Sequence, residues 1–92
     1  MSNKDDMSIV SLLARSKKRI KVLKSLEKED KIPSKISKDI DDNSNHVSKY
    51  LKTLKDANLV ECLNEQDKRY RFYSITDKGR YYLDKVENKY DK

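Results

Sequence analysis

The sequence contains very little glycine and cysteine, and each shortage excludes a class of site. It has one glycine, Gly79, and one cysteine, Cys62, among 92 residues. Phosphate-binding loops and dinucleotide-binding fingerprints need two or more glycines at fixed spacings, so neither occurs here. A single cysteine excludes an internal disulfide framework and a zinc site made only of cysteines. We therefore expect no metal, no cofactor and no small-molecule ligand.

Long hydrophobic runs are also missing from the sequence. No apolar run approaches the ~20 residues that a membrane-spanning helix needs. Polar residues follow Met1 where a secretory signal would be apolar, namely Asn3, Lys4, Asp5 and Asp6. The sequence thus predicts an intracellular, cytoplasmic protein that does not contact a membrane.

Groups suited to catalysis are scarce as well. His46 is the single histidine, and no carboxylates pair around an apolar pocket, so the chain offers no nucleophile with a matching base. His46 also lacks a partner ligand at helical spacing, which argues against a metal site. We do not expect an enzyme.

Charge is what the chain has in abundance. Charged residues make up 41% and hydrophobic residues 35%, and 22 Lys and Arg against 16 Asp and Glu give a net charge of +6. The excess suits a polyanionic partner such as nucleic acid. A disordered chain has a similar composition, but regular apolar spacings argue against disorder. The length predicts one domain over 8–92, after a flexible segment over 1–7.

Apolar spacing predicts helices over 8–15 and 17–29, which could also be one continuous helix. Ser16 could cap the second of them. A short helix over 33–40 should begin at Pro33, because proline lacks only an N–H group that would have no partner in the first turn.

The clearest amphipathic pattern lies over 44–57. Asn43 is expected to cap this helix, and Asn58 to end it in a left-handed conformation. Its apolar residues recur at i, i+3, i+4 and i+7, which predicts that they face the core: Val47, Tyr50, Leu51 and Leu54.

Two short apolar segments, 59–63 and 70–75, flank a polar loop and predict a hairpin. Thr76 should cap a last helix, and Gly79 inside that helix indicates close packing against a neighbour. The predicted class is α+β and mainly helical, in the order helix, helix, helix, hairpin, helix.

This order and its residues resemble a known family. Pro33–Leu63 (PSKISKDIDDNSNHVSKYLKTLKDANLVECL) and Arg71–Leu83 (RFYSITDKGRYYL) are similar to the winged helix-turn-helix of ArsR- and MarR-like transcription regulators. The resemblance covers about 17–86 and implies a three-helix core, a two-stranded wing and flanking terminal helices. The cysteine-pair motif of the family's metal sensors is missing.

Three positions depart from the family pattern. Asp41 stands where the family usually has the turn glycine, and Asp42 where it usually has an apolar residue that anchors the turn. Asn58 replaces a common glycine, a milder change. The two aspartates also bring negative charge close to the surface expected to meet DNA.

The resemblance implies a sequence-specific regulator that places helix 44–57 in the major groove of double-stranded DNA and uses hairpin 59–75 as the wing. Asn45, His46 and Lys49 are the expected base readers, while phosphate contacts are expected from Ser44, Ser48 and Lys52. On the wing, Lys68, Arg69 and Arg71 are candidates for backbone or minor-groove contact, although acidic and basic residues balance over 59–75. For both sets of residues, the alternative is a solvent-exposed surface that contacts no nucleic acid.

A basic run precedes this region, and we interpret it as an exposed helix face with one or two phosphate contacts at its start. Binding of an acidic partner is the alternative. The run comprises Lys17, Lys18, Arg19, Lys21 and Lys24.

The two terminal helices carry more apolar surface than a small domain must hide, and the resembling families dimerise through such helices. We expect a homodimer on a pseudo-palindromic DNA site; the alternative is that these helices cap a monomer core. The expected interface residues are Ile9, Leu12, Leu13, Tyr82, Leu83, Val86 and Tyr90.

Other functions stay open at this point. A winged helix can also serve as a protein-interaction module within a transcription or replication assembly, or bind structured RNA. A DNA-binding regulator would be associated with the nucleoid.

Overall fold

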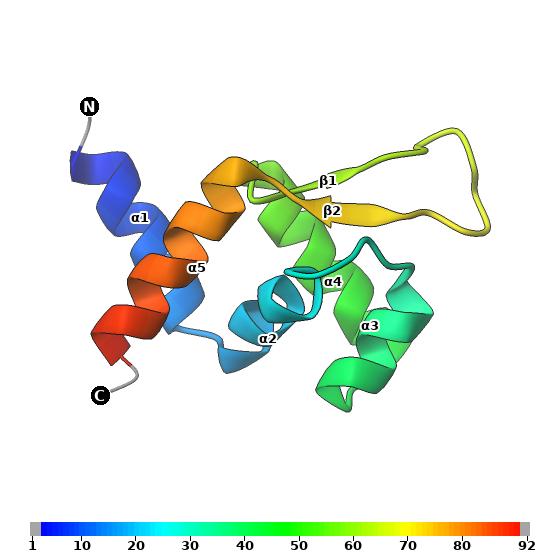
Figure 1. Cartoon of the computed structure of the whole chain (residues 1–92), viewed down its shortest axis with the longest axis horizontal. Coiled ribbons are helices and arrows are strands. Elements are labelled where there is room, and N and C mark those ends of the chain that lie inside the picture. The colour runs from blue at the N-terminus through cyan, green and yellow to red at the C-terminus, as the bar shows by residue number, and fades with distance from the viewer. Residues whose placement is uncertain (1–2, 91–92) are drawn as a thin grey trace.

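A computed structural model describes the backbone of residues 3–90 and the side chains of residues 6–88. Over that part of the chain it has five helices and one antiparallel hairpin (Figure 1): α1 (Asn3–Ala14), α2 (Lys17–Ser25), α3 (Pro33–Ile40), α4 (Ser44–Asp56), β1 (Val60–Cys62), β2 (Tyr73–Ile75) and α5 (Asp77–Tyr90). Helices α2, α3 and α4 pack on one another, and α1 lies beside α5 at the other end. This confirms the predicted class and element order.

Side-chain caps set the starts of three helices, as predicted. The Ser16 hydroxyl accepts a hydrogen bond from the Arg19 amide at 3.3 Å, so α1 and α2 are two helices and not one. The Asn43 carboxamide accepts from the His46 amide at 2.9 Å. The Thr76 hydroxyl accepts from the Gly79 amide at 2.9 Å. Each cap satisfies an N–H group that the first helical turn leaves free.

The N-terminal segment corrects one prediction. Residues 3–7 belong to α1, so this helix starts earlier than the predicted 8–15. The Asp6 carboxylate explains this earlier start, because it accepts hydrogen bonds from the Tyr82 hydroxyl and the Lys85 ammonium group of α5. These contacts hold the first turns of α1 against α5.

Other boundaries are shorter than predicted. Helix α2 ends at Ser25 rather than at 29, and both strands have only three residues. The strands pair with Val60 opposite Ile75 and Cys62 opposite Tyr73. Beyond the paired residues, the Asn64 side chain links the two arms of the hairpin. It donates to the Tyr70 carbonyl at 2.8 Å and accepts from the Phe72 amide at 2.7 Å.

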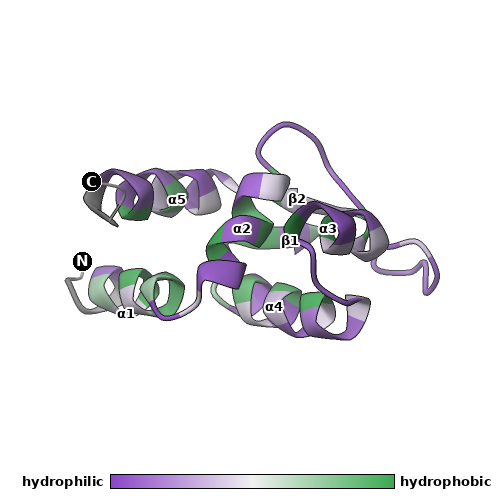
Figure 2. Cartoon of the chain, turned by 90° about the horizontal axis from the view of Figure 1, so that it is seen from below, coloured by the Kyte–Doolittle hydropathy of each residue, from purple (hydrophilic) through white to green (hydrophobic). Residues whose placement is uncertain are grey.

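The core lies where the apolar faces of the helices meet. Hydrophobic and hydrophilic residues alternate around each helix in Figure 2. The inner face of α4 is fully buried, with Val47, Leu51 and Leu54 at 0%, 1% and 0% exposure, and Ile36 and Ile40 of α3 are buried as well. The burial of Val47, Leu51 and Leu54 confirms their predicted inward positions. Among the described residues, every helix is too short or too polar to cross a lipid bilayer.

Gly79 marks a close contact between α5 and the hairpin. A Cβ atom at this position would overlap the carbonyl oxygen of Leu59 and would lie 2.8 Å from Cγ1 of Ile75. The backbone of Leu59 cannot withdraw easily, because its carbonyl also accepts a hydrogen bond from the Thr76 amide at 3.1 Å. The predicted packing reason for this glycine is therefore confirmed.

We predict that Gly79→Ala destabilises the protein despite the better helix propensity of alanine. Overpacking against a fixed backbone costs typically about 1–3 kcal/mol, whereas the propensity gain is about 1 kcal/mol. Urea unfolding should show a lower midpoint with an unchanged slope. Asn88→Ala, on the exposed face of the same helix, is the matched control and should not lower the midpoint. Equal midpoints for Gly79→Ala and wild type would contradict the close contact.

Candidate nucleic-acid interface

The turn between α3 and α4 sets the direction in which α4 leaves the core. Asp41 ends α3 in the left-handed conformation, with φ 57° and ψ 56°. Glycine adopts this conformation most easily, and aspartate tolerates it better than most other residues. Asn58, at the other end of α4, is also left-handed, with φ 64°, as predicted. Both turns therefore keep the backbone shape that glycine would otherwise provide.

Asp42 anchors the same turn by polar contacts. Its carboxylate accepts from the Asn43 amide at 2.7 Å, from Nδ1 of His46 at 2.8 Å and from the Tyr50 hydroxyl at 3.2 Å. Lys18 Nζ lies 3.6 Å away, and the Asp42 side chain is only 12% exposed. The hydrogen bond from His46, then that from the Asn43 amide, lowers the pKa of Asp42 to about 2. A charged, hydrogen-bonded residue thus takes the place of an apolar anchor.

The basic run on α2 is only partly an exposed face, which corrects the prediction. Lys18 Nζ donates to the carbonyl oxygens of Ile40 and Asp41 at 3.2 and 3.4 Å, at the end of α3. Arg19 Nη1 donates to the Leu12 carbonyl at 2.8 Å. Both side chains lack full exposure because they fasten neighbouring helices together. Lys24 pairs with Glu87 of α5 at 2.8 Å, and Lys17 and Lys21 are exposed.

The outer face of α4 holds all the side chains predicted to read bases or contact phosphates from this helix. They are exposed along its first turns: Ser44, Asn45, His46, Ser48, Lys49 and Lys52. His46 differs from the others because its ring is tied back to Asp42. Lys52 lies 3.8 Å from Asp56 in a pair whose side chains are 79% and 71% exposed. Such exposed pairs are weak, so Lys52 can exchange partners readily.

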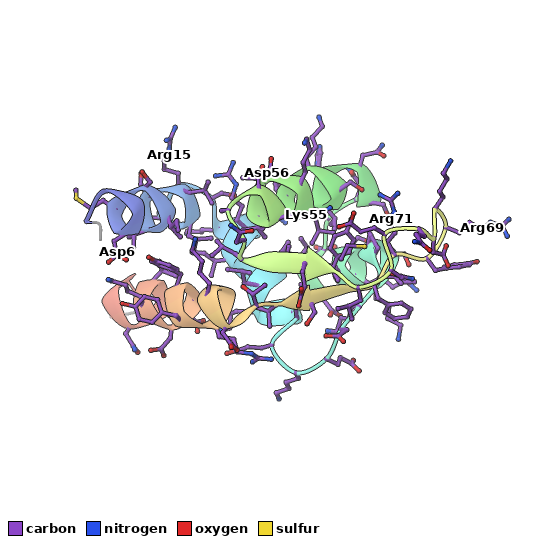
Figure 3. The ribbon with its side chains drawn as sticks, turned by 90° about the horizontal axis from the view of Figure 1, so that it is seen from above. Asp6, Arg15, Lys55, Asp56, Arg69 and Arg71 are labelled. Atoms are coloured by element: carbon purple, nitrogen blue, oxygen red, sulfur yellow. The ribbon has the colours of Figure 1, made fainter. Side chains whose placement is uncertain are left out.

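A groove runs between α4 and the wing, and we call it the basic groove. It encloses about 500 Å³ and is lined by Pro33, Ser48, Lys52, Lys55, Asp56, Lys68, Arg69, Arg71 and Tyr73. Figure 3 shows Lys55 and Asp56 on α4, Arg71 on the neighbouring hairpin and Arg69 at the hairpin tip. The structure thus brings the predicted wing residues together with Ser48 and Lys52 of α4 at one site. Ser44, Asn45, His46 and Lys49 are not among the residues that line it.

Lys55 is a groove residue that was not among the predicted site residues. It could have been found from spacing, because Ser48, Lys52 and Lys55 follow one helical face. Lys55 Nζ lies 2.9 Å from a carboxylate oxygen of Glu65 on the wing. This hydrogen bond raises the pKa of Lys55 and lowers the pKa of Glu65. The pair ties the wing to α4 across the groove.

The wing tip is shaped by Asp67. Its carboxylate accepts from the amides of Arg69 and Tyr70 at 2.8 and 3.0 Å, and these bonds, the Tyr70 amide first, lower its pKa. Arg71 Nε donates to the Asp67 carbonyl at 3.0 Å, which holds that side chain along the loop. Outside the groove, the wing also exposes large apolar side chains: Leu63, Tyr70 and Phe72.

Most side chains expected in a dimer interface lie inside the single chain, which corrects their assignment. They are 0–7% exposed because α1 and α5 cover each other: Ile9, Leu13, Tyr82, Leu83 and Val86. Leu12 is partly buried against the same cluster, and the side chain of Tyr90 lies outside the described ones. In Figure 3, Asp6 projects between the two helices and Arg15 points away from them.

A different stripe of α1 remains uncovered. Met7, Val10, Ser11 and Ala14 follow the i, i+3, i+4, i+7 pattern of one helix face and line a shallow hollow with Asp6, Arg15 and Lys85. Met7 is 71% exposed. Among the described side chains, His, Cys, Asp and Glu form no group of three that could hold a metal ion.

Comparison with known proteins identifies the family. The model of the winged helix-turn-helix family matches residues 15–92, most of the chain. The chain belongs to the winged helix-turn-helix family. This confirms the resemblance inferred from the sequence. No curated protein matches the chain significantly.

Solved structures of transcription regulators share this winged helix-turn-helix fold. A PadR family transcription regulator from hypervirulent Clostridium difficile is 22% identical and has a TM-score of 0.71, over 83% of this chain and 88% of that one. The homodimeric winged helix-turn-helix DNA-binding domain of a possible ArsR-family regulator from Mycobacterium bovis is 21% identical, with a TM-score of 0.72 over 97% and 88%. The S. aureus MepR–DNA complex is 18% identical, with a TM-score of 0.70 over 94% and 77%. Likeness at these identities establishes the fold.

We predict that the Asp42 anchor makes stability depend on acidity. Because its folded-state pKa is lowered from 3.8 to about 2, its contribution is complete above the unfolded value of 3.8 and is lost as the pH falls towards 2. Asp42→Asn should therefore unfold at a lower temperature than wild type at pH 7, and the difference should shrink between pH 4 and pH 2. Circular dichroism melting curves would measure both effects. Asp84→Asn, on an exposed position of α5, is the control; a constant difference at every pH would contradict the prediction.

Proposed function

We propose that the protein is a sequence-specific transcription regulator that binds double-stranded DNA, with α4 in the major groove and the wing beside it. The basic groove carries this proposal. It joins Lys52 and Lys55 of α4 to Lys68, Arg69 and Arg71 of the wing on one surface, and the exposed polar face of α4 continues from it. Winged helices dock on DNA with these two elements. A relative with the same fold was solved as a DNA complex.

The proposed contacts divide into two groups. Asn45, His46 and Lys49 lie on the first turns of α4, where a helix in the major groove meets base edges. Phosphates are contacted by Ser44, Ser48 and Lys52, and the wing arginines reach the backbone or minor groove. The Lys52–Asp56 pair is highly exposed, so a phosphate can replace the Asp56 carboxylate at little cost.

We predict that duplex binding weakens steeply with salt and that two substitutions separate the two groups. The log–log slope should be about −0.9 for each phosphate contacted. Lys52→Ala should weaken binding to all duplexes alike and reduce the slope by about 1, whereas Asn45→Ala should relax the preference at one base pair by roughly 1–3 kcal/mol. Fluorescence anisotropy on a duplex selected from a random pool, and on a scrambled one, measures both.

Lys78→Ala is the matched control, since Lys78 is exposed on α5 and is not among the residues that line the basic groove. It should leave both affinity and slope unchanged. A slope near zero, or equal effects of Asn45→Ala on the selected and scrambled duplexes, would reject this assignment of contacts.

A protein-interaction module within a transcription or replication assembly is the second candidate. The exposed apolar side chains on the wing favour it: Leu63, Tyr70 and Phe72. Exposed apolar groups of this kind occur at protein contacts. If the protein binds a protein partner but no DNA duplex, the protein-interaction module is the correct function and the DNA-binding regulator is not.

We also propose that the protein acts as a homodimer through the uncovered stripe of α1. Met7, Val10 and Ala14 line a hollow beside Lys85 of α5, in which Met7 and Ala14 are exposed and Val10 is partly buried. A relative with the same fold is homodimeric. A two-fold dimer implies a pseudo-palindromic site with half-sites about 10–11 base pairs apart or a multiple of that. Such a regulator would work in the cytoplasm, on the nucleoid.

We predict that Met7→Glu converts the dimer into a monomer. A carboxylate buried at the N-terminal end of the stripe opposes association, while the 71% exposure of Met7 in the single chain leaves the fold intact. Light scattering should give twice 10.9 kDa for wild type and 10.9 kDa for the variant.

Ser8→Glu adds the same charge at the next, exposed position of α1 and should remain dimeric. A wild-type protein that scatters as a monomer at 100 times the DNA-binding concentration would refute the dimer. If wild type is a dimer and Met7→Glu has the same dimeric mass, this interface is refuted.

A further inference from the structure

The ring of His46 is held in one orientation by Asp42. Nδ1 of His46 lies 2.8 Å from Oδ1 of Asp42. The other groups around this carboxylate are all donors, namely the Asn43 amide, the Tyr50 hydroxyl and the Lys18 ammonium group. A carboxylate surrounded by donors is an acceptor. Nδ1 of His46 must therefore carry a proton and donate it to Asp42.

This fixes the character of the other ring nitrogen. In the neutral imidazole only one nitrogen bears a proton, so a proton on Nδ1 leaves Nε2 with a lone pair. The His46 side chain is 53% exposed. None of the described hydrogen bonds involves its Nε2, and this atom is not among the buried polar atoms without a partner. In the neutral ring, Nε2 is thus an accessible acceptor on the outer face of α4.

We propose that Asp42 is a positioning residue which presents Nε2 of His46 as a hydrogen-bond acceptor, so that the protein prefers adenine or cytosine at the base facing His46. In the major groove these two bases offer an amino group, N6–H₂ of adenine and N4–H₂ of cytosine. Guanine and thymine offer O6, N7 or O4, which are acceptors and cannot pair with a lone pair on Nε2. This inference rests on the proposed function, because it needs α4 in the major groove.

The charged groups from neighbouring elements support the same orientation. Lys18 of α2 lies against Oδ2 of Asp42, and the Tyr50 hydroxyl donates to that same oxygen. Oδ1 is left for His46 and for the Asn43 amide. Arg19 acts electrostatically on Tyr50, the donor to Oδ2. The two carboxylate oxygens therefore have different partners. Oδ2 links the turn to Lys18 of α2, and Oδ1 orients the ring of His46.

The first test needs no DNA. Proton–nitrogen correlation spectra of the imidazole at pH 8.5 report which ring nitrogen is protonated. We expect the proton on Nδ1 in wild type and its loss from Nδ1 in Asp42→Leu, which removes the acceptor but can still fill the turn. Tyr50→Phe is the matched control: it removes a bond to the other oxygen of Asp42 and should leave the proton on Nδ1. A wild-type proton on Nε2 overturns the inference directly, whatever the variants do.

The second test measures base preference on the selected duplex, with each base in turn at the pair facing His46. Wild type and Tyr50→Phe should favour adenine or cytosine there by about tenfold. Asp42→Leu and His46→Ala should each lose that preference at the same pair, and the double variant should lose no more than either one, because both changes remove one contact.

The outcomes separate this inference from the function on which it rests. Salt-dependent duplex binding with a preference that Asp42→Leu leaves intact overturns the role of Asp42 alone. Additive losses in the double variant do so as well, since they indicate two independent effects. Absence of salt-dependent binding to any duplex overturns the proposed function and the base preference together.

Discussion

Burial of the inner face of α4 is the constraint on which the interface depends. Val47, Leu51 and Leu54 are almost completely buried, and exposing one such side chain costs roughly 1.5–3 kcal/mol. A rotation of α4 about its axis would expose several of them together, so its rotation is fixed. Residues between these positions must then face outward, which places Asn45, Lys49 and Lys52 on the free side of the helix. The Lys55–Glu65 pair and the hairpin then complete the groove beside that face.

Structural features that depend on residues close together in the sequence could be predicted. A cap such as Asn43 acts three residues ahead, and apolar periodicity is read within one helix, so the helices and inward positions were correctly anticipated. The Asp42–Lys18 pair could not be foreseen, because it joins different helices. The partners of the terminal helices could not be predicted either. Apolar residues on α1 and α5 can pack on each other or on a second chain, and both arrangements give the same sequence pattern. Here α1 packs against α5 within one chain, and Leu13 and Leu83 are buried.

Net positive charge proved a weaker guide to the site than the position of each charge. Several cations outside the groove hold the fold together: Lys18 bonds the end of α3, Arg19 the end of α1, and Lys85 bonds Asp6. The groove itself mixes lysines and arginines with Asp56 and borders Glu65. The proposed affinity for a polyanion would thus come from the arrangement of a few side chains, and salt should compete with it effectively.

The polar turn between α3 and α4 combines two tasks that an apolar anchor would keep apart. An apolar residue at 42 could hold α4 against the core equally well, but it would leave the ring of His46 free to rotate. Asp42 instead links the turn, Tyr50 and His46 through one carboxylate. Burying that charge is tolerable only because donors surround it and Lys18 balances it. The departure from the usual turn therefore couples the placement of α4 to the orientation of one of its proposed base-reading side chains.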